Sequence, residues 1–352
     1  MEFGLFTLFD FYPGRQDEVR YYRDTLELSV LADELGYDSI WVGEEHFYSF
    51  GVCPSPQIFL TAVAARTERI RLGTAISLLP FDNPLRKAED FAVLDLLSGG
   101  RLDFGVGRGA IAKHFQGFDV DAGESRDRYQ EAISVIKQAW SGGEVVHDGQ
   151  FWRVPGVTVS PAPVQRPHPP IYQGTVSVES YEAAALAGDN AFVVPWTTGP
   201  HAELRPRLDR YRELVRANGA EGREAAMFFL FIDDDHRQAV REAREVTGRY
   251  SQHITSHAAA RGGKDPKSTL FDRAEFMTSI PDHVEERGVV GRPDACIRRI
   301  KELDDELGLD KVAFYFHPGA RDVASARRTI ERFAHEVMPH FKDAGMRLAT
   351  GV

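Results

Sequence analysis

The sequence predicts a single closed (β/α)8 TIM barrel that spans residues 1–352. Short apolar runs rich in β-forming residues alternate with longer amphipathic segments along the chain, and eight such strand–helix units can be counted. Strands that are separated by helices pair in parallel through right-handed crossovers, and eight units close this kind of barrel. The fold usually takes about 250 residues, so a chain of 352 residues leaves roughly 100 for insertions.

The predicted strands follow one another at intervals long enough for a helix. In chain order they are Phe3–Phe9, Ser39–Gly43, Ile70–Ala75, Leu102–Val106, Ile171–Gly174, Ala191–Val194, Met227–Ile232 and Val312–Phe316. Between them, Asp17–Leu35 has apolar residues at helical spacing, and Gly36 follows it as glycine commonly follows a helix C-terminus. Pro84–Leu97 repeats this pattern ahead of Gly99.

Two insertions can be placed between the strands. The segment 144–157 has the turn pair Asp148-Gly149 between strand-prone flanks, which predicts a small hairpin before the fifth strand. The segment Ser251–Arg292, between strands seven and eight, is polar, rich in glycine at its centre and without clear periodicity. A loop of that length inside a compact domain is usually functional or disordered, and we expect a mobile lid.

Composition excludes several classes of protein. The chain has 42 Lys and Arg against 53 Asp and Glu, a net charge of −11, which argues against nucleic acid or an anionic membrane as the main partner. No apolar run is long enough to cross a bilayer, and the first residues do not resemble a signal peptide. The two cysteines, Cys53 and Cys296, have no metal-ligand spacing. We therefore expect a cytoplasmic protein without a metal site.

The residues that follow the predicted strands matter most, because barrel active sites lie at the C-terminal ends of the strands. Glu44, Glu45 and His46 follow the second strand. Two carboxylates beside an imidazole suit acid–base chemistry, since histidine titrates near neutrality. A solvated loop is the alternative. No second histidine stands at a spacing that suits a metal.

A glycine-rich stretch, Gly105–Ala110, follows the fourth strand and contains Arg108. Small residues let the backbone approach a ligand, and an arginine there can bind a phosphate. The stretch also fits the pattern G-x-G-x-x-A of dinucleotide-binding folds. That interpretation is disfavoured, because the pattern belongs on the first strand–helix unit and here three units precede it.

Ser177 and Ser180 lie where a helix begins after the fifth strand. Hydroxyls at a helix N-terminus suit a phosphate, but they equally suit capping of the helix, and the residues alone leave both open. Acidic residues at Asp233–Asp235 precede another helix, and we interpret them as caps rather than as a cation site.

Taken together, these motifs resemble those of the bacterial luciferase-like flavin monooxygenases, and the chain looks similar to their α chains over nearly its whole length. The most specific stretch is Leu94–Gly109 (LDLLSGGRLDFGVGRG). Further matching segments are Gly73–Pro80, Asn83–Asp90, Ile171–Ser180, Val290–Ile297 and Glu336–Lys342. The reference members of this family are (β/α)8 barrels, so the resemblance implies the fold that the strand pattern predicts.

The resemblance implies that FMN binds at the C-terminal mouth of the barrel. Arg108 would meet the phosphate, together with Ser177, Ser180 and the backbone near Val176. The flavin ring would be contacted by Ala75, Gly107 and Ala110. The family's third strand further implies a non-proline cis peptide between Ala75 and Ile76.

The implied activity is monooxygenation. Reduced FMN from a separate NAD(P)H:flavin reductase would react with O2 to give a C4a-peroxyflavin that oxygenates a small apolar substrate. His46, positioned by Glu44 or Glu45, would manage the proton transfers. A homodimer is expected. The alternatives within the superfamily are a deazaflavin-dependent hydride-transfer enzyme and a non-catalytic flavin-binding partner subunit.

Two residues depart from the family pattern. Luciferase α chains carry two histidines after the second strand's glutamate, whereas here Glu45 replaces the first of them. They also carry a cysteine where this chain has Gly107. Light emission is therefore not expected, and the choice of catalytic base between Glu45 and His46 stays open.

Overall fold

Parallel strands form a closed barrel at the centre of the molecule. The computed structural model describes residues 1–49, 51–195, 201–259, 278–318 and 320–342. Within them, eight strands pair around the barrel, and the last pairs again with the first. In order around the barrel they are β1 (Glu2–Thr7), β2 (Ser39–Val42), β3 (Arg71–Thr74), β5 (Leu102–Gly107), β8 (Ile171–Thr175), β9 (Asn190–Val193), β10 (Glu224–Ile232) and β12 (Lys311–Tyr315). The predicted fold class is confirmed.

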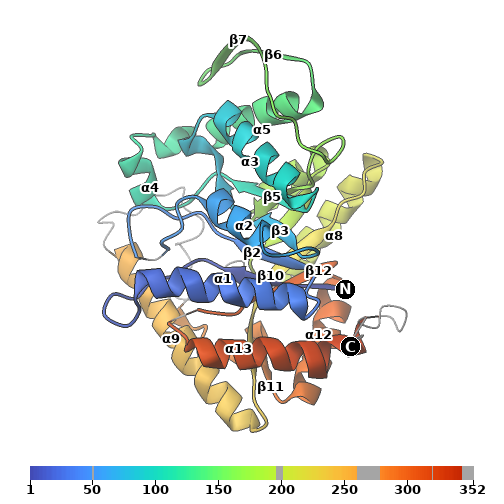
Figure 1. The fold of residues 1–352 in the computed structure, drawn as a ribbon. Coiled ribbons are helices and arrows are strands. Elements are labelled where there is room, and N and C mark those ends of the chain that lie inside the picture. Colours follow the sequence, from blue (N-terminus) through green and yellow to red (C-terminus); the bar gives the residue numbers. More distant parts are fainter. Residues whose placement is uncertain (50, 196–200, 260–277, 319, 343–352) are drawn as a thin grey trace.

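Helices cover the outside of the barrel (Figure 1). They are α1 (Glu18–Glu34), α2 (Pro56–Ala64), α3 (Pro84–Ser98), α4 (Ala112–Gly117), α5 (Ser125–Ser141), α6 (Val178–Leu186), α8 (His201–Ala217), α9 (His236–Ala259), α11 (Val284–Arg287), α12 (Pro293–Leu307) and α13 (Val323–Arg332). Short 3₁₀ or π turns lie at Leu79–Phe81, Ala122–Glu124, Phe333–Val337 and Met338–His340. Among these helices, none combines the length and apolarity that crossing a bilayer needs.

The predicted helix ends are confirmed by their caps. The carboxylate of Asp17 accepts a hydrogen bond from the backbone N–H of Arg20, 2.9 Å away, where α1 begins. Asn83 caps α3 in the same way, and Gly99 ends it with a φ of 67°, a conformation that glycine adopts without steric cost. The capping residues in the sequence therefore determine where these helices begin and end.

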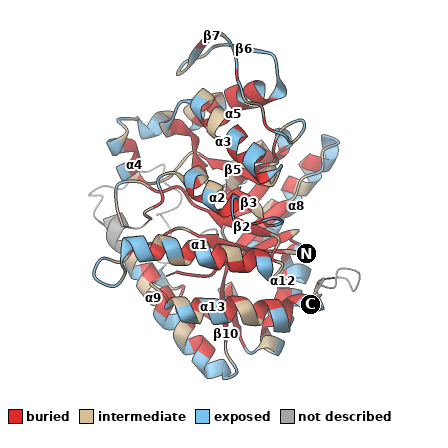
Figure 2. Ribbon diagram, viewed as in Figure 1, coloured by how far each residue is buried: buried red, intermediate tan, exposed pale blue. Residues whose placement is uncertain are grey.

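Two apolar layers hold the barrel. One fills its interior and includes Phe6, Trp41, Tyr172 and Tyr315. The other lies between the strands and the helices, whose inner faces are buried while their outer faces are exposed (Figure 2). Gly73 belongs to the first layer, because a Cβ there would lie 2.2 Å from the ring of Trp41. The interior is a packed core up to the level of the strand ends.

The predicted hairpin is confirmed. Strands β6 (Glu144–Asp148) and β7 (Arg153–Thr158) pair antiparallel ahead of β8, and they project from the body of the molecule (Figure 1).

The second insertion contains more regular structure than we expected from its sequence. Helix α9 continues to Ala259, and α11 leads into a short strand, β11 (Gly288–Gly291), which pairs in parallel with the end of β10. The expectation of an irregular segment over Ser251–Arg292 is therefore wrong for these parts. The buried positions Val246, Tyr250 and Ile254 keep a helical spacing that the polar residues between them obscured. Residues 260–277, the centre of the expected lid, lie outside the described residues.

Candidate active site

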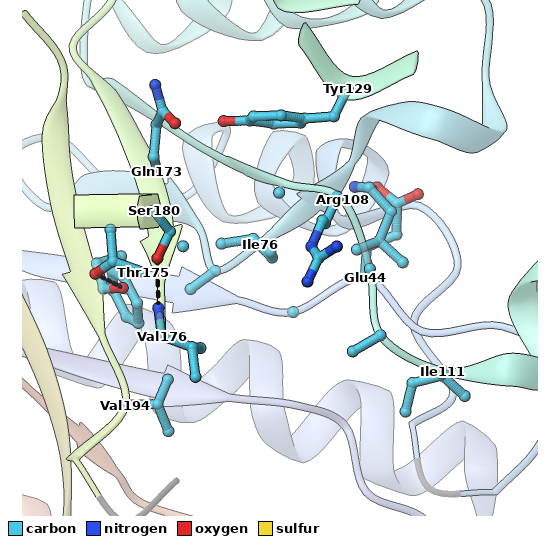
Figure 3. A pocket seen from close by; sticks show the side chains of 18 of the residues that line it. Glu44, Ile76, Arg108, Ile111, Tyr129, Gln173, Thr175, Val176, Ser180 and Val194 are labelled. Carbon is cyan, nitrogen blue, oxygen red and sulfur yellow. Dashed lines mark hydrogen bonds between the residues drawn. The ribbon is translucent and has the colours of Figure 1, made fainter. Parts of the chain in front are cut away.

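A cavity of about 280 Å³ opens at the C-terminal ends of the barrel strands, where barrel enzymes place their active sites (Figure 3). One part of its wall is apolar and comes from Phe6, Leu8, Ile76, Ile111, Phe192 and Met227. Phe9 and Phe11, which follow Phe6 in the sequence, are not among the residues that line this cavity, because both are buried in the layer between strands and helices. The cavity therefore combines an apolar wall with the polar groups described below.

The third strand provides a ledge in this cavity. Strand β3 ends at Thr74, the peptide between Ala75 and Ile76 is cis, and the chain resumes as β4 (Ser77–Leu78), which pairs with β5. The predicted cis peptide is confirmed. Ala75 and Ile76 both line the cavity.

Glycines on the neighbouring strands make room for this ledge. A Cβ at Gly107 would lie 1.9 Å from Cδ1 of Ile76, and one at Gly174 would lie 3.1 Å from the same atom. A cysteine in place of Gly107, as in luciferase α chains, would require Ile76 to move. Ala110 also lines the cavity, so the three residues predicted to contact a flavin ring (Ala75, Gly107 and Ala110) lie around one space.

Glu44 lines the cavity, but its carboxylate is fully engaged. One oxygen lies 2.8 Å from Nζ of Lys87 and 2.7 Å from the hydroxyl of Ser77, and the other lies 3.1 Å from Nε2 of His46. Burial alone would raise the pKa of Glu44, but the ammonium of Lys87 and these hydrogen bonds lower it to about 2. Glu44 therefore stays ionised and acts as an anchor. Lys87 was not indicated by the sequence.

His46 lies differently from our expectation. Its ring contacts Glu44, Phe47 and Phe118, and it is not among the described residues that line the cavity. Phe47 has a φ of 66°, which is uncommon for a bulky residue and fixes the course of this loop. The proton-transfer role of His46 remains a prediction, and its side chain lies behind Glu44.

Glu45 lies at the cavity with a partner that the sequence analysis missed. Its Oε2 is 3.1 Å from Nε2 of His114, a residue of α4, and it also accepts a hydrogen bond from the hydroxyl of Tyr48 at 3.1 Å. His114 is 1% exposed and lines the cavity. The only sequence signal for it was its position, seven residues after Gly107 at the end of β5.

The groups expected to bind a phosphate line the same cavity. Figure 3 shows the guanidinium of Arg108 pointing into the cavity, with Val176 and Ser180 on the facing wall. A second arginine, Arg126, also lines the cavity. Two arginines that share one cavity with the N-terminus of α6 suit an anion.

The two serines interact with their own loop. The hydroxyl of Ser180 accepts a hydrogen bond from the N–H of Val176 at 2.9 Å and donates one to the carbonyl of Ser177 at 2.6 Å. Ser177 is the N-cap residue of α6 but makes no capping hydrogen bond. A hydrogen bond from its own backbone and one from Ser177 lower the pKa of Glu179. Local and ligand roles for these hydroxyls thus both remain open.

The acidic residues before α9 are caps, as interpreted from the sequence. A carboxylate oxygen of Asp235 accepts the backbone N–H of Arg237 at 2.9 Å, and Asp233 accepts that of Asp235 at 2.9 Å. In the part of the chain that the structure describes, no three potential ligands cluster as a metal site.

A family model described as "Luciferase-like monooxygenase" matches residues 1–311. The chain belongs to this family. The resemblance drawn from the sequence motifs is therefore confirmed, and with it the assignment to a family of flavin-dependent monooxygenases.

Relatives of this luciferase-like chain cover almost its whole length. It is 27% identical over 98% of its length, and 96% of the relative's, to the protein "Flavin-dependent trigonelline monooxygenase, oxygenase component" of Acinetobacter baylyi. Among solved structures, the monooxygenase RslO1 of Streptomyces bottropensis has 30% identity and a TM-score of 0.87, with 97% of this chain and 100% of that one covered. The oxygenating constituent of 3,6-diketocamphane monooxygenase of Pseudomonas putida, solved with FMN, has 20% identity and a TM-score of 0.81 over 96% and 98% of the chains.

Proposed function

We propose that the protein is the oxygenase component of a two-component monooxygenase that uses reduced FMN and O2. The observation that carries this proposal is the cavity itself, which brings apolar side chains, the Ala75–Ile76 ledge and two arginines, Arg108 and Arg126, together in one space. A flavin ring and a phosphate need these two environments in one space. The trigonelline monooxygenase relative, an oxygenase component by its name, supports the proposal.

The residues present fit FMN. Ile76 packs into the space left by the missing Cβ atoms of Gly107 and Gly174, so a flavin ring would lie against Ile76, and Arg108 would hold the phosphate with the α6 N-terminus. Ser177 and Ser180 would join it once their hydroxyls turn from their present partners. Bound reduced FMN would supply the electrons that activate O2. The apolar wall would exclude water from the reacting atoms.

The substrate in this proposal is a small, mainly apolar organic molecule, because the described wall beside the ledge offers Phe6, Leu8 and Met227. A separate NAD(P)H:flavin reductase would deliver reduced FMN in the cytoplasm. We also propose a homodimer. It is supported by exposed apolar side chains on the adjacent helices α2 and α3, namely Ile58, Val93, Leu96 and Leu97.

Turnover with labelled oxygen tests the proposed function. The protein is mixed with NADH, a generic flavin reductase, FMN, 18O2 and pools of aldehydes, ketones, terpenes and trigonelline. We expect one labelled oxygen atom in one product, found by mass spectrometry, and none when FMN is left out. Reduction of a substrate by a reduced deazaflavin without O2, and no labelled product with FMN, would replace the proposal by the hydride-transfer alternative.

A further inference from the structure

We propose that Glu45 and His114 together form the proton-transfer pair of the cavity, the role that the sequence motifs predicted for His46. The proposal rests on the function proposed above, because it concerns the protons that accompany the reduction of O2. Both side chains line the cavity, and they come from different loops, after β2 and after β5. Their closest atoms, Oε2 of Glu45 and Nε2 of His114, are 3.1 Å apart.

Two neighbours compete for Nε2 of His114. The backbone N–H of His46 donates to it at 3.2 Å, while the carboxylate of Glu45 lies 3.1 Å away. A protonated Nε2 donates to Glu45 and leaves that N–H without its acceptor. An unprotonated Nε2 has one lone pair, which accepts either from that N–H or from a protonated Oε2 of Glu45. The protonated and the unprotonated state of Nε2 each gain one hydrogen bond and lose another. Their free energies are therefore similar, as transfer of a proton requires.

The second ring nitrogen of His114, Nδ1, does not determine whether Nε2 carries a proton. Nδ1 of His114 is buried and has no hydrogen-bond partner among the described residues. In most histidines a partner on one nitrogen sets the tautomer and thereby the role of the other. Here that constraint is missing, so a proton can be shared between Oε2 of Glu45 and Nε2 of His114 while Nδ1 keeps its own proton, as a carboxylic acid beside a neutral imidazole or as a carboxylate beside an imidazolium.

Among the described residues, the salt-bridge partner of Glu45 is His114 and not a lysine or an arginine. The hydroxyl of Tyr48 donates to Oε2 at 3.1 Å, and Nζ of Lys113 lies 5.7 Å from the centre of the Tyr48 ring. On the other side, burial and the charges of Asp10 and Glu45 raise the pKa of Tyr250, so this neighbour stays neutral. Glu44, by contrast, is tied to Lys87 at 2.8 Å. Of these two cavity carboxylates, Glu45 is the one that pairs with a histidine instead of a lysine.

In the absence of substrate the overall reaction is FMNH2 + O2 → FMN + H2O2, with two electrons and two protons passing from the flavin to oxygen. Glu45 passes one of these protons. Its Oε2–H bond would break as an O–H bond forms on the oxygen being reduced, which would leave a Glu45 carboxylate beside a neutral His114. The pair would regain one proton from the reduced flavin, held either on Oε2 of Glu45 or, as an imidazolium beside the carboxylate, on Nε2 of His114. Glu45 is thus the residue that contacts the ligand, while His114 positions Glu45 and returns a proton to it.

The first test follows reoxidation of protein-bound reduced FMN by O2 in a stopped-flow instrument between about pH 5 and 8. Glu45→Gln and His114→Gln should each slow reoxidation by about 100-fold, the usual scale of acid–base catalysis, and remove the pH dependence. The double variant should be no slower than either single one, and the affinity for FMN should not change. His147→Gln is the matched control, since His147 of the hairpin pairs with Glu131 of α5 at 3.0 Å.

The proposal is wrong if both variants keep the wild-type rate and pH profile, or if the pH dependence disappears in His46→Gln and persists in Glu45→Gln. A second readout needs no flavin: 15N NMR of the histidine rings in the free protein. Glu45→Gln should shift the ring nitrogen signals of His114 and leave those of His147 in place, and unchanged His114 signals would overturn the pairing. If the wild type does not bind reduced FMN at all, the proposed function fails, and the NMR result still decides whether the pair exists.

Discussion

Lys87 is the residue whose loss should affect stability most among those near the cavity. Its ammonium lies 2.8 Å from a carboxylate oxygen of Glu44, and each side chain is 3% exposed. The lowering of the Glu44 pKa from 4.5 to about 2 corresponds to about 3 kcal/mol at 1.36 kcal/mol per tenfold change. Because Lys87→Met leaves a buried carboxylate without its cation, we expect the free energy of unfolding at pH 7 to fall by about 3–5 kcal/mol.

Urea unfolding of wild type, Lys87→Met and the exposed control Lys301→Met measures this loss. The folded-state pKa of Glu44 lies below its unfolded value, so the stability it contributes is present above pH 4.5 and is lost as the pH falls toward 2. The deficit of Lys87→Met should therefore shrink on acidification. Adding Glu44→Gln should restore part of the stability. A deficit at pH 7 no larger than that of Lys301→Met, or one that grows in acid, would refute the reasoning.

Three further outcomes can be measured directly. Arg108→Ala should weaken FMN binding by about 10- to 100-fold in a fluorescence titration, and unchanged affinity would contradict its phosphate role. Gly107→Ala should lower the free energy of unfolding by about 1–3 kcal/mol and weaken FMN binding, because its Cβ would lie 1.9 Å from Ile76; a variant unchanged in both would contradict the ledge. Burial and then the charge of Arg321 lower the pKa of His317 to about 4, so the unfolded chain binds its proton first as the pH falls below 6.5. Wild type should therefore lose about 2 kcal/mol more than His317→Phe between pH 7 and pH 5, and equal losses in the two proteins would show that this histidine titrates normally.

The barrel was predictable because its signals are local. Caps such as Asp17 and Asn83, and the C-terminal Gly99, act within a few residues of the boundaries they set. The same reasoning failed over Ser251–Arg292, where α9 continues with few apolar buried positions, such as Ile254, and with buried polar residues, such as Ser251. The many polar residues of that segment hid the helical spacing of its few apolar residues.

From the sequence, only those site residues could be predicted that directly follow a strand. Glu44, Glu45 and Arg108 follow strands and lie at the cavity. Which of these side chains is paired with an opposite charge depends on contacts with residues that are far away in the sequence. Lys87 is 43 residues from the carboxylate of Glu44 that it pairs with. His114 meets the loop after β2 across 68 residues. No local sequence pattern encodes contacts over such separations. These contacts decide which carboxylate is paired with a lysine and which is paired with a histidine.

The most direct test of the account is the reaction of the protein with reduced FMN and O2. Under anaerobic conditions the protein is titrated with reduced FMN and, separately, with a reduced deazaflavin, and each complex is then mixed with O2. We predict that one reduced FMN binds per chain, that the deazaflavin binds more weakly, and that O2 oxidises the bound FMN at a rate different from that of free reduced FMN. Tighter binding of the deazaflavin, or oxidation at the rate of free FMN, would contradict the account.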